Sequence, residues 1–296
     1  MKNNYDVIII GSGIAGMTTA IYLKRGGLNP LIIEESAPGG QLNRISTIEN
    51  YPGFVKITGP ELTSEIYCQV ENLKIDYLFD KVLKAELNGP TKKIITQNHE
   101  LTCTYLVIAT GRLSKKLFTS DEQYLGKGIS YCATCDGPLY KDKDVAVVGG
   151  GNSALEEALY LSDICKSVTL IHRRDQFRGE QTLIDKVISK NNIKCVYNSN
   201  ITEYNIENGK LTSILLDNNQ SIDVSGLFIS IGSVPSADVF DVKKDKGFII
   251  VDKNCNTNIE NVYACGDVIK KDVYQLTTAA SEGTIVAYNI IKNNKK

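Results

Sequence analysis

Short apolar runs recur along the chain, and two of them lead directly into glycine-rich turns. Residues 6–10, 31–33, 145–148 and 168–171 are rich in Val and Ile, which predicts strands buried on both faces of a parallel sheet. Residues 17–24 and 155–161 follow the two glycine turns and have helical composition. Strand, glycine turn and helix therefore occur twice. This order predicts an α/β fold with two Rossmann-like nucleotide-binding domains.

The balance of charge gives no general reason to bind nucleic acid or an anionic membrane. The 296 residues include 33 Lys and Arg against 34 Asp and Glu, a net charge of −1. A chain of this length has room for about two domains. Apolar runs stay far below the roughly 18 residues of a transmembrane helix, and the N-terminus has no secretory signal. We therefore expect a cytoplasmic protein.

The first glycine turn has the pattern of a dinucleotide site. Gly11 permits a tight turn after the strand, Gly13 lets backbone N–H groups approach a pyrophosphate, and Gly16 allows close packing of helix on strand. The next predicted strand ends in Glu34, where a carboxylate can accept hydrogen bonds from ribose hydroxyls. The expected nucleotide-binding residues here are Gly11, Ser12, Gly13, Ala15, Gly16 and Glu34.

The second glycine turn, in the middle of the chain, has a different specificity signal. The strand after it runs into a basic cluster instead of an acidic residue. Arginines at that position can bind a 2′-phosphate through charge-assisted hydrogen bonds, which favours NADPH over NADH. The alternative is a solvated basic loop. The expected residues are Gly149, Gly151, Asn152, Ser153, Ala154, His172, Arg173, Arg174 and Arg178.

The chemistry is expected at a C-x-x-C motif between the two turns. Cys132 and Cys135 can cycle between dithiol and disulfide, and on a turn that opens a helix their thiol pKa values would be lowered. Asp136 is the expected proton donor, and its alternative role is that of a helix cap. A metal site is not expected, because no second C-x-x-C motif accompanies the two histidines, His99 and His172. The other six cysteines are expected to be reduced and mostly buried.

An ordered set of motifs closely resembles the low-molecular-weight thioredoxin reductases of the pyridine nucleotide-disulfide oxidoreductase family. Beyond the turns and the cysteines, the set includes residues 39–42, 49–53, 109–111 and 264–267. The resemblance implies FAD in the first site, NADPH in the second, a homodimer, and a thioredoxin-like protein as disulfide partner. It adds to the expected flavin site Gly39, Gly40, Gln41, Leu42, Asn50, Ala109, Thr110, Gly111, Gly266, Asp267 and Gln275.

The resemblance also implies a domain layout. Residues 1–112 and 243–296 would form a discontinuous FAD domain, and residues 113–242 an inserted NADPH domain with the redox disulfide. Two features depart from the family pattern. An arginine expected before Gln275 is replaced by Tyr274, and Arg112 stands where a small residue is common.

Two other functions stay open at this point. One is a ferredoxin-fed thioredoxin reductase that does not use pyridine nucleotide, although such proteins lack the second glycine turn and the arginine cluster, which are both present here. The other is an FAD-binding redox sensor without turnover, which has no need of a phosphate-selective second nucleotide site.

Overall fold

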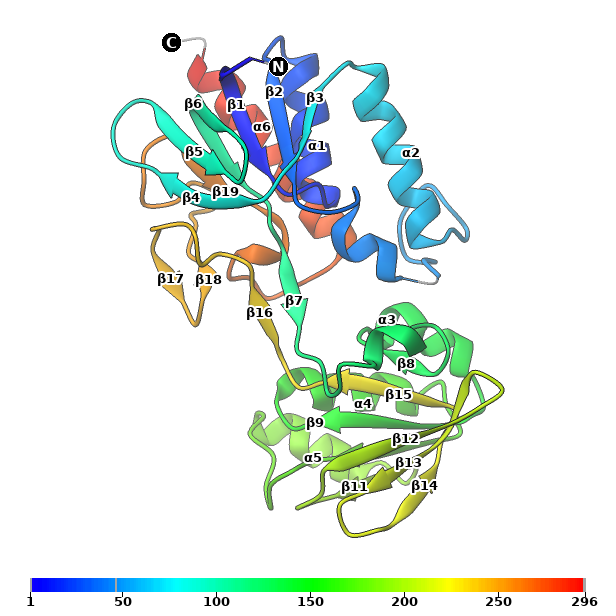
Figure 1. Ribbon diagram of the computed structural model, residues 1–296. Helices are drawn as coiled ribbons and strands as arrows, with labels where there is room; N and C mark the ends of the chain where they lie inside the picture. Colours follow the sequence, from blue (N-terminus) through cyan, green and yellow to red (C-terminus); the bar gives the residue numbers. More distant parts are fainter. Residues whose placement is uncertain (1, 46, 295–296) are drawn as a thin grey trace. The chain divides into compact units, whose positions relative to one another are not determined.

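The chain divides into two compact units in the computed structural model, which describes residues 2–45 and 47–294. Unit 1 comprises Met1–Arg44, Tyr51–Leu113 and Val234–Lys296, and unit 2 comprises Ile45–Asn50 and Ser114–Ser233. Each unit contains a sheet with a set of parallel strands (Figure 1), and a glycine turn follows one strand of each set. The predicted α/β fold is confirmed.

Unit 1 is built on a seven-stranded sheet in the order β3-β2-β1-β6-β5-β4, with β19 pairing on β6. Strands β3, β2, β1, β6 and β19 are parallel, whereas β4 and β5 are antiparallel additions. Its strands are β1 (Asn4–Ile10), β2 (Pro30–Glu34), β3 (Asp76–Phe79), β4 (Val82–Glu86), β5 (Lys92–Thr96), β6 (Glu100–Ile108), β17 (Lys244–Asp245), β18 (Phe248–Ile249) and β19 (Val262–Ala264). Its helices are α1 (Ile14–Arg25), η1 (Gly40–Arg44), α2 (Gly59–Asn72), η4 (Gly266–Val268) and α6 (Leu276–Asn294).

Helices α1 and α6 pack closely because small residues meet at their contact. A Cβ on Gly283 of α6 would collide with the carbonyl oxygen of Ala15 in α1. Thr19 hydrogen-bonds across the same contact, from its hydroxyl to the Gly283 carbonyl at 3.2 Å. The C-terminal helix thus supports the helix that follows the first glycine turn.

Unit 2 has a five-stranded parallel sheet in the order β11-β10-β9-β15-β8, and a separate sheet in the order β12-β13-β14. Its strands are β8 (Ile129–Ser130), β9 (Asp144–Gly149), β10 (Ser167–Ile171), β11 (Ile193–Val196), β12 (Ile201–Glu207), β13 (Lys210–Leu216), β14 (Ser221–Asp223) and β15 (Gly226–Ser230). Its helices are η2 (Asp121–Tyr124), α3 (Ala133–Asp136), η3 (Gly137–Tyr140), α4 (Asn152–Ser162) and α5 (Gln181–Ser189). The short strands β7 (Arg112–Ser114) and β16 (Ser233–Pro235) pair where the chain passes between the units.

The central strand β9 shows how unit 2 buries both faces of its sheet. Val145 and Val147 pack with residues of α4, whereas Ala146 and Val148 pack with residues of β12 and β13. Successive side chains of a strand point to opposite faces, so a strand covered on both faces reads as a continuous apolar run. This explains why the sequence pattern located β9 so closely.

The chain returns to unit 1 at Val234, earlier than the expected position near residue 243. Ala237, Phe240 and Val242 are buried in the core of unit 1 together with Ile8 and Ile108. They lie in an irregular segment, so no strand or helix period marked them in the sequence.

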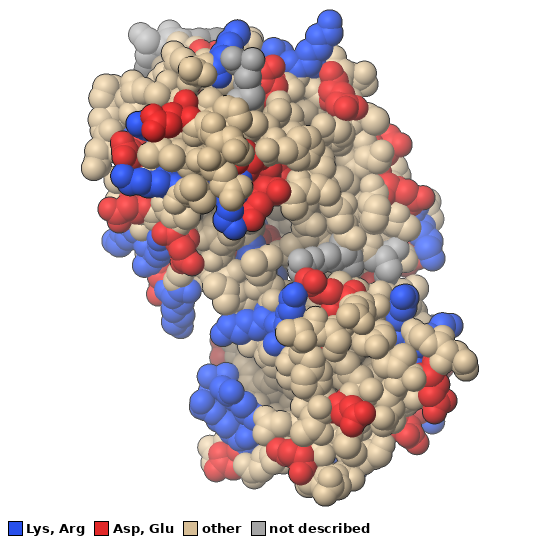
Figure 2. All heavy atoms as spheres, in the orientation of Figure 1, with Lys and Arg blue, Asp and Glu red and all other residues tan. Residues whose placement is uncertain are grey.

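Among the described residues, no helix has both the length and the apolar character needed to cross a membrane. Acidic and basic side chains are interspersed on the face of the molecule shown in Figure 2.

Candidate redox and nucleotide sites

The first glycine turn connects the carboxyl end of β1 to α1 and needs glycine at two positions for steric reasons. Gly11 has a φ of +102°, and a Cβ there would collide with the carbonyl oxygen of Ala109. A Cβ on Gly16 would collide with the carbonyl oxygen of Gly11. These two glycines therefore let β1, α1 and the residue after β6 approach one another.

Gly13 has no such steric reason to be glycine. It is the N-cap of α1, with an ordinary φ of −65°, and an added Cβ would meet nothing within 4 Å. No side chain caps the first turn of α1, and no acidic residue lies in it. Free N–H groups at a helix N-terminus attract anions, so the turn fits a pyrophosphate that needs close backbone approach.

Glu34 lies beside this turn at the end of β2. Its Oε2 accepts hydrogen bonds from the backbone N–H and the hydroxyl of Ser12, both at 2.9 Å. Ser36 donates to the other carboxylate oxygen from its N–H at 3.2 Å. The carboxylate is thus held in place next to the turn, as expected for a ribose-binding acidic residue.

Most of the other expected flavin residues lie in unit 1, close to the same turn. Gly39 donates its N–H to the Ser12 carbonyl at 3.0 Å, and the Gln41 amide donates to the carbonyl of Arg112. The Thr110 hydroxyl donates to the carbonyl of Ser236 at 2.5 Å. Gly40 and the buried Leu42 lie in η1, and Ala109 contacts Gly11. Gly111 has a φ of +66°, and Gln275 lies just before α6. Asn50 lies in the segment that groups with unit 2.

Asp267 lies at the centre of a charged cluster that the sequence did not indicate. Its carboxylate is 3.3 Å from Nε of Arg112 and 3.4 Å from Nζ of Lys271. Lys271 also pairs with Glu282 at 2.9 Å, and Glu282 accepts the N–H of Gly266 at 2.8 Å. Burial raises the pKa of Glu282, while hydrogen bonding to Lys271 opposes the rise.

Arg112 and Tyr274, the two departures from the family pattern, contact each other in this cluster. The guanidinium carbon of Arg112 lies 4.1 Å from the centre of the Tyr274 ring. This is cation–π geometry. Arg112 therefore brings a positive charge to the residue that replaces the expected arginine.

The second glycine turn connects β9 to α4 and repeats the design of the first. Gly149 has no room for a side chain, because a Cβ would collide with the carbonyl oxygen of Ser230. Gly151, the N-cap of α4, has a φ of −99° and open space around it, and no side chain caps this helix. Asn152 and Ser153, at the start of α4, are exposed, and Ala154 is fully buried.

His172 differs from the arginines that follow it. It is 3% exposed, and a Cβ on Gly150 would collide with its ring, so it packs directly against the turn. Burial lowers the pKa of His172, and the charges of Arg178 and Arg174 act in the same direction. The imidazole therefore supports the turn as a neutral group.

The arginines of the cluster are exposed, as a phosphate-binding role requires. Arg173, Arg174 and Arg178 all lie at the surface after β10. Arg178 is tied to the turn itself, because its N–H donates to the Gly150 carbonyl at 2.7 Å. The basic cluster and the second glycine turn are therefore neighbours within unit 2.

Cys132 and Cys135 form a disulfide in the same unit, with their Cα atoms 5.3 Å apart. Cys132 is the N-cap of α3, which is one turn long, so a lowering of thiol pKa by a helix dipole is smaller than expected from the sequence. Asp136 ends this turn and is 8% exposed. It precedes η3 but makes no side-chain cap hydrogen bond there, which argues against the capping role.

The residue that holds Asp136 is Ser130, which sequence reasoning missed. The Ser130 hydroxyl lies 2.7 Å from Oδ2 of Asp136 and 3.1 Å from the N–H of Cys132. A serine two residues before the C-x-x-C motif could have been noted as a neighbour, but its contact with Asp136 depends on the turn of α3.

The six other cysteines are free, and five of them are at least partly buried. Burial raises the pKa of the Cys103 and Cys255 thiols to about 12 and that of Cys165 to about 11. Cys265 is fully buried against Thr19, as expected for a small core residue. Among these six, Cys68 alone is exposed.

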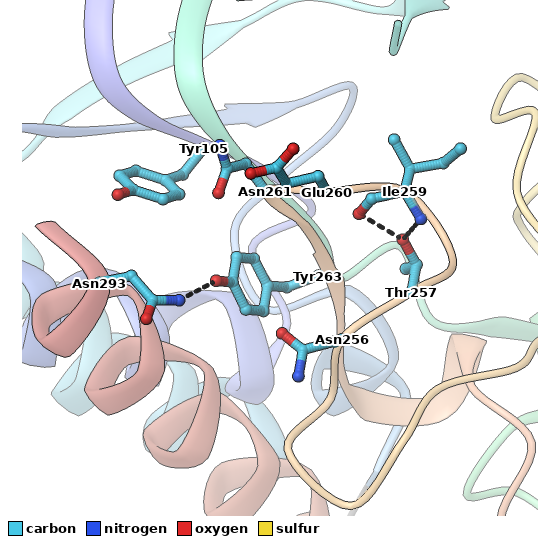
Figure 3. Close-up of a pocket in the computed structure, with 8 residues that line it drawn as sticks. All are labelled: Tyr105, Asn256, Thr257, Ile259, Glu260, Asn261, Tyr263 and Asn293. Atoms are coloured by element: carbon cyan, nitrogen blue, oxygen red, sulfur yellow. Dashed lines mark hydrogen bonds between the residues drawn. The ribbon is translucent and has the colours of Figure 1, made fainter. Parts of the chain in front are cut away.

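A cavity of about 520 Å³ lies in unit 1 (Figure 3). It borders Asn261, before the amino end of β19, and Asn293, which donates to the Tyr263 hydroxyl at 3.1 Å. The glycine turn and Asp267 follow carboxyl ends of strands, where ligands bind in open α/β sheets. This cavity is therefore not part of the nucleotide site.

Comparison with known proteins agrees with this geometry. The family model for pyridine nucleotide-disulphide oxidoreductases matches residues 5–283. A thioredoxin reductase of Ureaplasma parvum is 39% identical over 96% of this chain and 94% of its own length, and one of Buchnera aphidicola is 40% identical over 97% and 96%. The crystal structure of thioredoxin reductase from Streptococcus pyogenes, 36% identical, covers 100% of this chain and 99% of its own with a TM-score of 0.93. The chain belongs to the pyridine nucleotide-disulphide oxidoreductase family.

Proposed function

We propose that this protein is an NADPH-dependent FAD flavoenzyme that reduces the disulfide of thioredoxin or a thioredoxin-like protein. The observation that carries the proposal is the Cys132–Cys135 disulfide in the unit that also holds the second glycine turn and the basic cluster. The curated relatives named thioredoxin reductase, similar over nearly their whole length, support the choice of partner.

The proposed FAD site lies in unit 1. The turn at Gly11 to Gly16 would hold the pyrophosphate, Glu34 a ribose, and Asp267 the ribitol chain. The open space at Gly13 and the uncapped start of α1 support this assignment. When bound, FAD supplies two-electron transfer between a nicotinamide and a disulfide.

The proposed NADPH site lies in unit 2. The turn at Gly149 to Gly151 would hold the pyrophosphate, and Arg173, Arg174 and Arg178 the 2′-phosphate. The exposure of all three arginines supports this assignment. We also propose that the protein is a homodimer, which rests on the family resemblance, and that it is cytoplasmic, which is supported by its similarity to bacterial thioredoxin reductases.

The cysteines carry the disulfide chemistry. Reduction of the Cys132–Cys135 bond takes up two electrons and two protons and gives two thiols. Asp136, buried and next to Cys135, is the proposed proton donor to the thiolate that leaves when the bond breaks. One of the thiols then attacks the partner's disulfide, the other resolves the mixed disulfide, and the pair is oxidised again.

The test is an anaerobic titration of the FAD-loaded protein with NADPH and, separately, with NADH, followed by flavin absorbance. Bleaching by NADPH in clear preference to NADH is expected. In a variant with Arg173→Ala and Arg174→Ala, the NADPH concentration needed for half-maximal flavin bleaching should rise at least tenfold. The NADH concentration needed for the same bleaching should not change. No bleaching by either nucleotide would contradict the proposal and favour the ferredoxin-fed enzyme or the redox sensor.

A further inference from the structure

Ser130 is buried at the redox centre on a very short strand. Its side chain is 2% exposed, and its backbone pairs with Phe228 in the fully buried part of β15. A buried hydroxyl needs hydrogen-bond partners, because leaving it unpaired destabilises the folded state. The partners of Ser130 therefore show what this serine does.

The hydroxyl makes one short hydrogen bond as donor. The Asp136 carboxylate oxygen Oδ2 lies 2.7 Å away, whereas the Cys132 carbonyl lies 3.4 Å away. A hydroxyl has a single proton, and the shorter distance to a carboxylate marks the stronger bond. Ser130 thus donates to Asp136.

The same oxygen accepts a hydrogen bond from the redox motif. The N–H of Cys132 lies 3.1 Å from it. Asp136 is therefore linked to Cys132 through Ser130. It also contacts Cys132 directly, because the Asp136 N–H donates to the Cys132 carbonyl at 3.1 Å. Ser130, Cys132 and Asp136 therefore form a closed ring of hydrogen bonds around the start of α3.

We infer that Ser130 is a positioning residue, whose hydroxyl holds the Asp136 carboxylate beside the Cys132–Cys135 disulfide and locks it to the Cys132 backbone. This inference rests on the proposed function, in which Asp136 donates a proton, and goes beyond it by naming the group that orients the donor. A proton donor contributes to the rate only when it is held within reach of the accepting atom.

A titratable neighbour of Asp136 lies in the short helix that follows it. Tyr140 of η3 is close enough that the Asp136 charge, together with burial, which is the larger cause, raises the pKa of Tyr140 to about 12. From α4, the Tyr160 ring packs against Gly137, the residue after Asp136. The Tyr140 phenol is therefore neutral near pH 7 and places no charge beside Asp136. The Ser130 hydroxyl favours the ionised form of Asp136, because it donates a hydrogen bond to the carboxylate.

The experiment compares Ser130→Ala with the native chain by ¹³C NMR titration of the Asp136 carboxyl group, assigned by the signal that Asp136→Asn removes. Loss of the hydroxyl should raise the pKa of Asp136 by about one unit, a tenfold change in its proton affinity. Ser162→Ala is the matched control, since Ser162 is also buried in unit 2 and its hydroxyl donates to the Leu159 carbonyl. It should leave the titration unchanged.

A second measurement in the same variants is the rate at which a small dithiol reduces the Cys132–Cys135 disulfide. Ser130→Ala should slow this reduction about tenfold and shift the Asp136-dependent step of its pH profile upward by about one unit, whereas Asp136→Asn should remove that step. Neither measurement requires NADPH or thioredoxin. A shifted titration in a protein that fails to reduce thioredoxin would therefore sink the proposed function and leave the role of Ser130 intact.

The inference is overturned if Asp136 in folded Ser130→Ala titrates as in the native protein, or if the dithiol reduction rate is unchanged. Ser130→Thr keeps the hydroxyl but adds a methyl group in a packed site. If Ser130→Ala does not fold, a native titration of Asp136 in Ser130→Thr supports the inference, and a raised pKa in this hydroxyl-bearing variant overturns it.

Discussion

At the scale of single residues, each of the two glycine turns contains glycines that packing requires and a glycine that packing does not require. Gly11, Gly16 and Gly149 have no space for a side chain. Gly13 and Gly151 have ordinary backbone angles and open surroundings. Glycine at these two positions is explained by close approach of a phosphate to the backbone.

This contrast predicts different outcomes for two substitutions in one turn. Gly13→Ala should fold with a thermal midpoint within a few degrees of native, yet bind FAD at least tenfold more weakly, because the methyl group occupies the space of the pyrophosphate. Gly16→Ala should destabilise the apoprotein by several kcal/mol, since its methyl group collides with the Gly11 carbonyl. Thermal unfolding without FAD and flavin fluorescence titration check the two effects. Unweakened FAD binding by Gly13→Ala would contradict the assignment.

Arg112 shows a residue whose role no local pattern could reveal. Its partners Asp267 and Tyr274 lie near the other end of the chain, so only the fold brings them together. Removing a partly exposed cation–π contact and an ion pair costs roughly 1 kcal/mol.

Arg112→Ala should therefore lower the free energy of unfolding by about 1 kcal/mol. Arg112→Lys should lower the free energy of unfolding less than Arg112→Ala, because lysine keeps the charge but not the planar group that stacks on Tyr274. Denaturant unfolding of the apoprotein measures both. Equal stability of native protein and Arg112→Ala would show that the contact contributes nothing.

At the scale of elements, the sequence located the strands and helices next to the glycine turns well. Strands β1, β2, β9 and β10 coincide with the predicted apolar runs, because strands buried on both faces have an unbroken signal. The sheet β12-β13-β14 was not predicted, since one of its faces is exposed and its apolar pattern is broken. The single turn of α3 is too short for any periodicity to predict its length.

Asp80 contacts several residues of the loop between β5 and β6 and makes the stability of this region depend on pH. Its buried carboxylate accepts hydrogen bonds from Thr96 at 2.7 Å and Asn98 at 3.2 Å, and lies 3.0 Å from Nδ1 of His99. Burial alone would raise the pKa of Asp80, but these hydrogen bonds outweigh it and hold the pKa well below the usual range.

A depressed carboxylate pKa contributes stability above the unfolded-state pKa of about 3.9, and this contribution is lost as the pH falls below it. Asp80→Asn should therefore lower the free energy of unfolding at pH 7. The fall in the free energy of unfolding between pH 7 and pH 3 should be smaller in Asp80→Asn than in the native protein. Denaturant unfolding at the two pH values measures the change. An unaltered pH dependence in Asp80→Asn would contradict the role of this carboxylate.

At the scale of the whole molecule, two nucleotide-binding units were predicted, with a first passage of the chain after residue 112 and a return near residue 243. The passage lies after Leu113 and the return lies at Val234. Residues such as Phe240 join the core of unit 1 from an irregular segment, and no sequence period marks such a contribution. The cysteines were easier to interpret, because a C-x-x-C spacing has a direct chemical meaning whereas isolated cysteines are usually core residues.

The environments of the exposed and buried cysteines predict which thiols react with a thiol reagent. In the oxidised protein, a thiol reagent at neutral pH should modify Cys68 quickly, and Cys103, Cys165, Cys255 and Cys265 should react only on unfolding, because they are buried and burial raises their thiol pKa. Anaerobic reduction of the FAD-loaded protein by NADPH should add the thiols of Cys132 and Cys135. Mass spectrometry of alkylated peptides measures each site. No added modification at this pair after NADPH would show that electrons do not reach the disulfide.

The most direct test of the proposed electron path is anaerobic oxidation of NADPH by the FAD-loaded protein with oxidised thioredoxin as acceptor. We predict thioredoxin-dependent turnover in the native protein, and a loss of at least a hundredfold in Cys132→Ser and in Cys135→Ser, both with FAD still bound. Native-like turnover in either cysteine variant would contradict the account, because the electrons would then reach thioredoxin without the Cys132–Cys135 pair.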